Sequence, residues 1–244
     1  MKEQHLGISA FMHNRSEGLK KGKRIVQVAC TIVLAVVLSL PVIGQQKHAF
    51  QEEIDAFKVS DSISMPARKQ ILFTGSSSFR LWKDVQDYFP GYPIINRGVG
   101  GSTLDDIYYY RHELIDPYHP RQVIIYCGEN DFASSDTISA ATVVERFTKL
   151  HAYIRSVYPK VPVVFVSIKP SPSRRKYFAK MVEANAAIEH FCRKQKNTEF
   201  VNIYDAMLLP DGNPIPAIFT ADSLHMNDAG YRIWQQKLLP ALRH

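Results

Sequence analysis

Five short apolar runs, separated by segments with helical periodicity, constrain the fold of this 244-residue chain more than any other feature. Continuous apolar runs are typical of strands that lie in a sheet covered on both faces. Strands that alternate with helices predict right-handed crossovers and a parallel sheet. We therefore expect an α/β domain with about five strands, at 71–73, 94–95, 123–126, 163–166 and 200–203, and helices at 47–58, 103–115, 141–158, 177–196 and 228–242.

Polar clusters follow the predicted strands at the points where the strands end. Residues 75–78 follow the first strand, 96–103 the second, 128–131 the third and 167–171 the fourth, and residues 222–225 lie between the last strand and the last helix. In a parallel sheet the carboxyl ends of the strands face one crevice, where ligands bind. We therefore expect these five loops to lie on one rim of the domain.

Asp222 and His225, three residues apart, have the residue types that activate a serine nucleophile. A serine hydroxyl is a weak nucleophile at neutral pH and needs an adjacent base. A neutral imidazole can accept its proton, and a carboxylate can fix the tautomer of the imidazole and stabilise the imidazolium. The serines of Gly75-Ser-Ser-Ser78 follow an apolar run and are the candidates for this nucleophile.

Acyl transfer also requires donors for the oxyanion of the tetrahedral intermediate. A serine in a turn that leads into a helix offers its own N–H as well as its hydroxyl. Gly100 and Gly101 can bring a second N–H close, because no side chain stands in the way. The amide of Asn130, in a Gly-x-Asn sequence, is a third candidate donor.

These segments resemble, in order and spacing, the four blocks of the SGNH (GDSL-like) hydrolases. The blocks are Gly75-Ser-Ser, Gly-Gly-Ser-Thr at 100–103, Gly128-Glu-Asn130 and Asp222-Ser-Leu-His225, with matching flanks at 73–82, 96–104 and 225–231. The resemblance covers residues 70–240. It implies a flavodoxin-like, three-layer α/β/α fold and ester hydrolysis without a metal or a cofactor.

The resemblance also implies a role for each matching residue. Ser77, third in its block, would be the nucleophile, His225 the base and Asp222 the residue that orients it. The N–H groups of Ser77 and Gly101 and the side-chain amide of Asn130 would form the oxyanion hole. Many relatives have aspartate before the nucleophile, where this chain has Ser76.

Structural roles remain alternatives for the same residues. The departure at Ser76 leaves Ser76 and Ser78 as alternative nucleophiles, and Ser77 could merely cap a helix. The glycines and Asn130 could serve turns, Asp222 could begin a helix and His225 could be a packing residue. No Gly-x-Ser-x-Gly sequence surrounds these serines, which argues against the α/β-hydrolase fold.

The N-terminal region has the order of residues found in an export signal. Lys20, Lys21, Lys23 and Arg24 precede an uncharged, largely apolar run at 25–44. We predict cleavage before Gln45 and an extracytoplasmic (periplasmic or secreted) protein, with a retained membrane anchor or a buried core helix as alternatives. Met12 could be the true start. The expected division is 1–44 signal or anchor, 45–69 N-terminal helix and lead-in, and 70–244 hydrolase domain.

The distribution of charge, histidine and cysteine gives no sign of nucleic-acid binding, a metal site or a disulfide. The net charge is +7, but residues 1–44 hold six Lys/Arg and two Asp/Glu, which leaves +3 for the remainder. No basic stripe interleaved with aromatics indicates nucleic-acid binding, and no His/Glu spacing indicates a metal site. We expect Cys127 and Cys192 to be buried free thiols rather than a bridge, and Lys169, Arg174 and Arg175 to lie in a solvated loop rather than contact an anionic substrate.

The sequence indicates an ester as substrate but leaves its acyl chain open. Small-molecule, glycan and lipid esters all fit the resemblance, and membrane contact is expected only through an uncleaved N-terminal segment. We expect short acyl groups such as acetyl; the alternatives are a lysophospholipase or lipase, an acyltransferase, and a non-catalytic binding module. A long acyl groove would require exposed apolar residues in the rim loops, for which the candidates are Leu208, Leu209, Ile215, Ile218 and Phe219.

Overall fold

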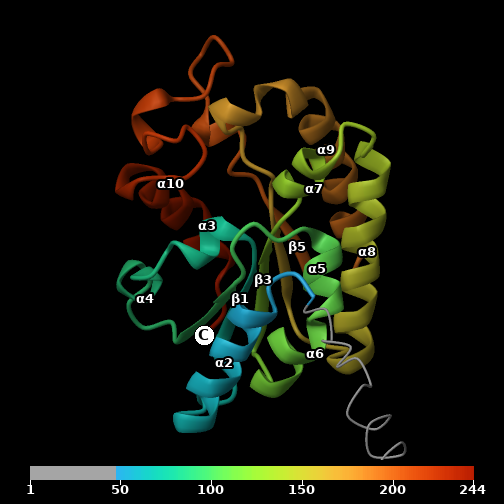
Figure 1. Ribbon diagram of the computed structural model, residues 1–244, viewed down its shortest axis with the longest axis vertical. Helices are drawn as coiled ribbons and strands as arrows, with labels where there is room; N and C mark the ends of the chain where they lie inside the picture. The colour runs from blue at the N-terminus through green and yellow to red at the C-terminus, as the bar shows by residue number, and fades with distance from the viewer. Residues whose placement is uncertain (1–47) are drawn as a thin grey trace, which may run out of the picture. The chain divides into compact units, whose positions relative to one another are not determined.

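Five parallel strands form the centre of the computed structural model, which describes residues 48–244 (Figure 1). They are β1 (Ile71–Gly75), β2 (Ile94–Gly98), β3 (Gln122–Tyr126), β4 (Val163–Val166) and β5 (Thr198–Val201). All neighbouring strands are parallel, and their order is β2-β1-β3-β4-β5. This is the flavodoxin-like order, so the predicted parallel sheet and fold class are confirmed. The predicted signal or anchor at 1–44 lies outside the described residues.

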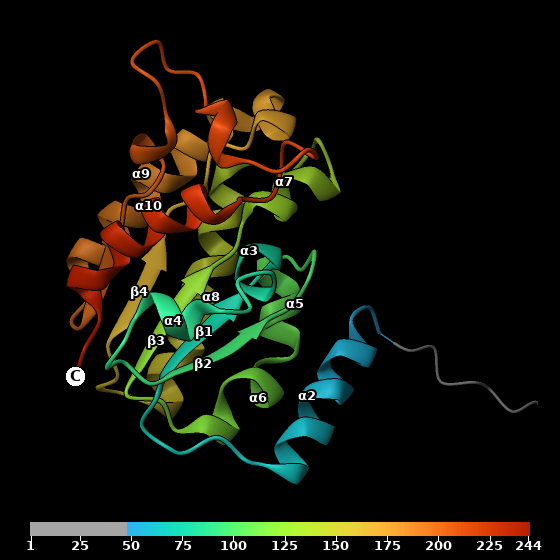
Figure 2. The same cartoon turned by 90° about the vertical axis from the view of Figure 1, so that its left-hand side faces the viewer.

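Helices cover both faces of the sheet (Figure 2). Strand side chains alternate between the two covered faces, so that Leu72 packs in one apolar core while Ile71 and Phe73 pack in the other. The first core includes side chains from α2 (Gln51–Ile63), α5 (Leu104–Tyr109), α6 (Arg111–Leu114), α7 (Glu129–Ser134), α8 (Ala140–Val157) and α9 (Phe178–Lys194). The second includes side chains from α3 (Ser77–Arg80), α4 (Val85–Tyr88) and α10 (Asp228–Leu238).

Several boundaries differ from those expected from the sequence. The strand expected at 200–203 spans Thr198–Val201, because the Ser167 hydroxyl accepts the N–H groups of Ile203 and Tyr204 at 2.9 and 3.0 Å and ends the pairing. The helix expected at 103–115 is divided at Tyr110 into α5 and α6. The first helix begins at Gln51 rather than at 47 and continues to Ile63.

The helix expected at 177–196 is α9, and a 3-10 segment (Pro172–Tyr177) precedes it. The helix expected at 228–242 ends at Leu238, where a 3-10 turn containing Pro240 follows. Proline lacks the N–H that an α-helix would need, which explains this ending.

Aromatic side chains join α3 to α10 within the second core. Phe79 of α3 lies 6.0 Å from Trp234 of α10 between ring centroids, and Trp82 lies 6.3 Å from Trp234. Tyr231 stacks on Trp82 at 4.7 Å and donates its hydroxyl to the Ser78 carbonyl at 2.9 Å. These contacts fix the short helix that follows β1 relative to the last helix of the chain.

The helix α2 packs within the same compact unit as the sheet, which spans residues 48–244. Ile54 is fully buried in the first core, and Asp61 forms an ion pair with Arg97 of β2. Cys127 and Cys192 are buried free thiols, as predicted. Within residues 48–244, no helix combines the length and the apolar composition needed to cross a bilayer.

Candidate active site

The structure brings together the three residues predicted to form a catalytic triad. Ser77 Oγ lies 3.0 Å from His225 Nε2, and His225 Nδ1 lies 2.5 Å from Asp222 Oδ2. Ser77 is half-buried, and the side chain of His225 is 23% exposed, so a substrate can reach both. The arrangement is that of a nucleophile, a base and an orienting carboxylate.

The turn that carries Asp222 and His225 is held by its own hydrogen bonds. Asp222 Oδ1 accepts the N–H groups of Leu224 and His225, both at 2.9 Å, and the hydroxyl of Thr220 at 2.7 Å. Ser223 adopts a left-handed conformation with φ 55°, which closes the turn. The mutual geometry of the acid and the base is therefore set locally.

The same hydrogen bonds keep Asp222 ionised. Partial burial acts to raise the pKa of this carboxyl, but the backbone N–H groups of His225 and Leu224, the His225 ring and the Thr220 hydroxyl outweigh it. Together they hold the pKa of Asp222 well below its usual range. A carboxylate that is ionised at neutral pH accepts the Nδ1 proton of His225, which leaves Nε2 free to accept the proton of Ser77.

The position of Ser77 depends on a close approach between β1 and β3. Gly75 has φ 140°, and a Cβ at this position would lie 1.9 Å from the Tyr126 carbonyl oxygen. Ser76 occupies the N-cap position of α3 without a side-chain cap bond, and Ser77 begins the helix. Ser76 and Ser78 are buried, at 2% and 1% exposure, which leaves Ser77 as the serine that meets His225.

The predicted oxyanion donors follow β1, β2 and β3: Ser77 begins α3, Gly101 lies in the loop after β2, and Asn130 lies in the first turn of α7. Within residues 48–244, the N–H groups of Ser77 and Gly101 have no hydrogen-bond acceptor, so both are available to a ligand. Gly101 has φ 82°, which favours glycine. Asn130 Nδ2 donates one hydrogen to the Ser102 carbonyl at 3.1 Å, which holds the amide beside this loop and leaves its second hydrogen free.

One expectation for the loop after β4 is wrong. Lys169 does not lie in a solvated loop: it is fully buried and forms an ion pair with Glu129, the residue before Asn130. The Tyr126 hydroxyl lies 3.2 Å from Lys169 Nζ and 3.1 Å from Glu129 Oε2. Burial lowers the pKa of Lys169, and the charge of Glu129 opposes this. The pair fills the interior beneath the loops that carry the site.

The neighbouring arginines differ from Lys169. Arg175 is exposed and donates to Asn213 Oδ1 at 2.8 Å, and Arg174 is half-buried.

No group of three or more His, Cys, Asp or Glu side chains within residues 48–244 is arranged to hold a metal ion.

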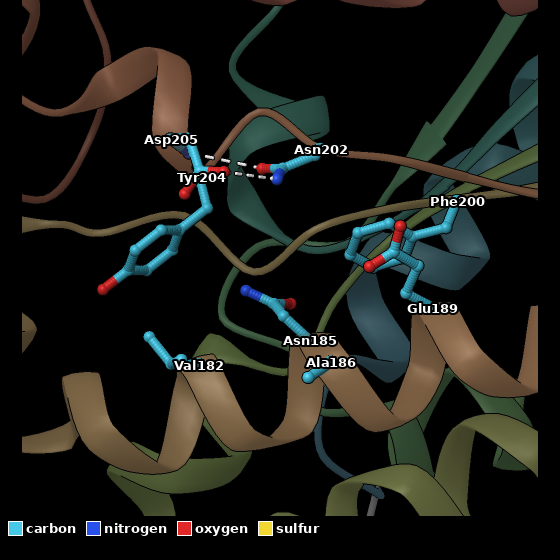
Figure 3. Close-up of a pocket in the computed structure, with 8 residues that line it drawn as sticks. All are labelled: Val182, Asn185, Ala186, Glu189, Phe200, Asn202, Tyr204 and Asp205. Carbon is cyan, nitrogen blue, oxygen red and sulfur yellow. Dashed lines mark hydrogen bonds between the residues drawn. The ribbon is translucent and has the colours of Figure 1, made fainter.

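A separate pocket of about 160 Å³ lies between α9 and residues 200–205 (Figure 3). The Asn185 amide is used by the backbone of Ile168, with bonds of 2.8 and 3.0 Å. Asn202 donates to Asp205 at 2.7 Å, as the dashed lines in Figure 3 show. None of the predicted site residues lines this pocket, and its amide groups are occupied by the protein itself.

Structures of similar fold come from several bacteria. A candidate platelet activating factor from Streptococcus pneumonia is 21% identical, with a TM-score of 0.70, covering 89% of this chain and 99% of the other. A GDSL-like lipase from Bacteroides thetaiotaomicron is 22% identical, with a TM-score of 0.67, covering 77% and 96%. A catalytic mutant of an acetylxylan esterase from Geobacillus stearothermophilus is 15% identical, with a TM-score of 0.58, covering 71% and 94%. At these identities the likeness establishes the fold.

The family is established by the sequence itself. None of the curated proteins matches the chain. The sequence model of the GDSL-like Lipase/Acylhydrolase family matches residues 61–233, which is more than half of the chain. That region contains Ser77, Gly101, Asn130, Asp222 and His225. The protein therefore belongs to the GDSL-like lipase/acylhydrolase family.

Proposed function

We propose that this protein is a serine esterase that cleaves O-acyl esters through an acyl-serine intermediate. The observation that carries the proposal is the continuous hydrogen-bonded chain from Ser77 Oγ through the His225 ring to Asp222, with distances of 3.0 and 2.5 Å. Membership of an acylhydrolase family supports the same reaction class.

In the acylation step, Ser77 Oγ attacks the ester carbonyl carbon while His225 Nε2 accepts the hydroxyl proton. The carbonyl oxygen becomes an oxyanion, which the N–H groups of Ser77 and Gly101 and the free amide hydrogen of Asn130 are placed to receive. His225 then donates its proton to the leaving alcohol oxygen as the C–O bond breaks. Asp222 stabilises the imidazolium between these two transfers.

In the deacylation step, a water molecule takes the place of the alcohol. His225 Nε2 accepts one proton from water while the water oxygen attacks the acyl carbon. The second tetrahedral oxyanion uses the same donors, and the proton on His225 returns to Ser77 Oγ when the acyl bond breaks. The products are a carboxylic acid and the free enzyme.

A short acyl group, such as acetyl on a carbohydrate or small ester, fits the described residues best. Of the five candidates for a long acyl groove, Ile218 and Phe219 are 5% and 7% exposed and pack in the second core, whereas Leu209 is 38% exposed. The other two, Leu208 and Ile215, are half-buried. A long acyl chain would need a continuous apolar surface, which a single exposed leucine does not provide. The acetylxylan esterase of similar fold is consistent with such a substrate.

Initial rates on p-nitrophenyl esters from acetyl to palmitoyl, for the wild type and Ser77→Ala, test the proposal. We expect the highest kcat/KM with acetyl or butyrate, and loss of at least about 10³-fold in Ser77→Ala. Unfolding midpoints of both proteins control for folding. Equal activity in the variant would overturn the assignment of Ser77.

Other outcomes of the same experiment would identify other functions. A maximum at long acyl chains would identify a lipase or lysophospholipase. A folded wild-type protein that turns over no ester would identify a binding module. Faster acyl transfer to an added sugar than to water would identify an acyltransferase.

We also propose that the enzyme acts outside the cytoplasm. The basic residues Lys20, Lys21, Lys23 and Arg24, followed by the uncharged run at 25–44, support export. Mass spectrometry of the protein expressed with its full N-terminal segment should find a chain that begins at Gln45. An intact N-terminus in a membrane fraction would instead identify an anchor.

A further inference from the structure

Glu53 of α2 contacts both the helix that begins with the nucleophile, α3, and the glycine loop that follows β2. Its Oε2 atom accepts the N–H of Gly100 at 3.0 Å, and its Oε1 atom forms an ion pair with Arg80 Nε. Gly100 directly precedes Gly101, and Arg80 lies three residues after Ser77. Both carboxylate oxygens are therefore used, and the side chain, 21% exposed, is largely enclosed by these contacts.

Arg80 adds a second restraint on the same loop. Its side chain crosses Gly100 so closely that a Cβ at Gly100 would lie 2.8 Å from Arg80 Cδ. A side chain at position 100 would therefore displace Arg80 from Glu53. Glycine at this position allows Arg80, Glu53 and the loop backbone to meet.

The start of α2 lies against the neighbouring Gly101. Phe50, which precedes the helix with φ 67°, places its ring 3.8 Å from the position that a Cβ of Gly101 would occupy. The Tyr110 hydroxyl donates to the Ala49 carbonyl at 2.8 Å, and His48 stacks on Tyr109 at 3.8 Å. The segment from His48 to Glu53 is thus fixed beside the loop by contacts independent of the carboxylate.

We propose that Glu53 is a positioning residue for the oxyanion hole, acting through the Gly100 N–H to fix the orientation of the Gly101 N–H. This inference rests on the proposed esterase function. Two consecutive glycines have more backbone freedom than other residues, and an oxyanion donor is effective only when it is already oriented. Glu53 holds the first peptide of the pair and leaves the next N–H unpaired for the substrate.

The test compares Glu53→Ala, Glu53→Gln and the wild type on p-nitrophenyl acetate. Alanine removes the acceptor of the Gly100 N–H, so we expect kcat to fall about 10- to 100-fold, with KM within about twofold. Glutamine keeps one of the two oxygens, which can still accept the Gly100 N–H while the ion pair with Arg80 is lost, so we expect a kcat between those of Glu53→Ala and the wild type.

A matched control is an ion pair that joins the same helix to α6. Glu113→Gln removes the charge that pairs with Lys58 of α2 at 3.4 Å, a contact distant in sequence from α3 and the glycine loop. We expect this variant to retain wild-type kcat. Unfolding midpoints of all variants show whether each is folded at the assay temperature.

Phosphorylation of Ser77 by diethyl p-nitrophenyl phosphate gives a second readout, because the developing phosphoryl charge needs the same donors. We expect Glu53→Ala to slow this reaction and glutamine to restore it in part. If the wild type is active and Glu53→Ala has an unchanged kcat, this inference is overturned while the proposed esterase function stands. The same holds if Glu53→Gln loses as much activity as Glu53→Ala. A wild type inert to both reagents would overturn the proposed function and this inference with it.

Discussion

Ser77 and His225 are 148 positions apart in the sequence and are joined by a hydrogen bond of 3.0 Å. Asp222 and His225, three residues apart, are joined at 2.5 Å within one turn. The acid and base are thus a local unit, whereas the distance from base to nucleophile depends on the packing of the whole domain. Variants can separate these two dependences.

Asp222→Asn should remove catalysis without removing the turn. The single amide oxygen can still accept the N–H groups of Leu224 and His225, but the NH₂ group then faces His225 Nδ1 and favours the tautomer with a proton on Nε2. That tautomer cannot accept the proton of Ser77, so we expect kcat to fall by about 10⁴. Steady-state kinetics measure this loss, and a fall of less than tenfold would contradict it.

Asp205→Asn is a suitable control for this charge change, since Asp205 is exposed and its carboxylate accepts a hydrogen bond from Asn202. We expect wild-type kcat in this variant.

Gly101→Ala should reduce both stability and activity, whereas Gly212→Ala should reduce stability alone. The two glycines have similar backbone conformations, with φ 82° and 79°, and no atom would lie within 4 Å of a Cβ at Gly212. We expect each variant to lose about 1–2 kcal/mol of unfolding free energy in urea. Only Gly101→Ala should lower kcat, because its N–H is a predicted oxyanion donor. Equal kcat in both variants would remove Gly101 from the oxyanion hole.

Lys169→Met should destabilise the fold strongly. Lys169 and Glu129 are 1% and 4% exposed in their side chains, and removal of the lysine leaves a carboxylate without its counter-ion in the interior. We expect a loss of about 3–5 kcal/mol in urea unfolding, and a smaller loss in the double variant Glu129→Gln/Lys169→Met, which buries no charge. A double variant as unstable as the single one would show that packing, rather than charge, dominates.

Lys176→Met serves as the exposed counterpart of Lys169→Met. Its ion pair with Asp136 spans 3.0 Å, but the two side chains are 63% and 77% exposed. Water screens such a pair, so we expect an unchanged urea midpoint.

Stability should decrease in mild acid because of His151. Burial, with the nearby charge of Arg155, lowers the pKa of His151 from its ordinary 6.5 to about 4. The unfolded chain therefore binds a proton that the folded protein excludes, so this stabilisation is complete above pH 6.5 and is lost as the pH falls towards 4. The unfolding temperature, measured between pH 7 and pH 4, should decrease less with falling pH in His151→Gln than in the wild type. Parallel curves would contradict the prediction.

The sheet could be predicted from the sequence because each strand is a compact apolar run between turns. The end of β5 could not, since the Ser167 hydroxyl, 36 positions from Ile203, decides where pairing stops. The helices α3, α4 and α7 span four to six residues, which is shorter than the windows that show helical periodicity. Their positions depend on tertiary contacts instead.

The residues of the candidate site could be predicted because their chemistry requires fixed residue types at short spacing, as in Asp222 and His225. Glu53 and Lys169 lie 47 and 40 positions from their partners Gly100 and Glu129, and no local pattern marks them. Lys169 beside Pro170 has the composition of a solvated loop, and its burial follows from its ion pair with the buried Glu129, which the sequence does not indicate.

The aromatic junction between α3 and α10 contains both tryptophans of the chain, Trp82 and Trp234. The helix α3 begins with Ser77, and α10 begins three residues after His225. Tryptophan fluorescence therefore reports, without a label, on the packing of α3 against α10, which sets the distance between nucleophile and base. During unfolding, a change in tryptophan emission before the loss of secondary structure would show that α3 and α10 separate first. The enzyme would then be inactivated by this separation.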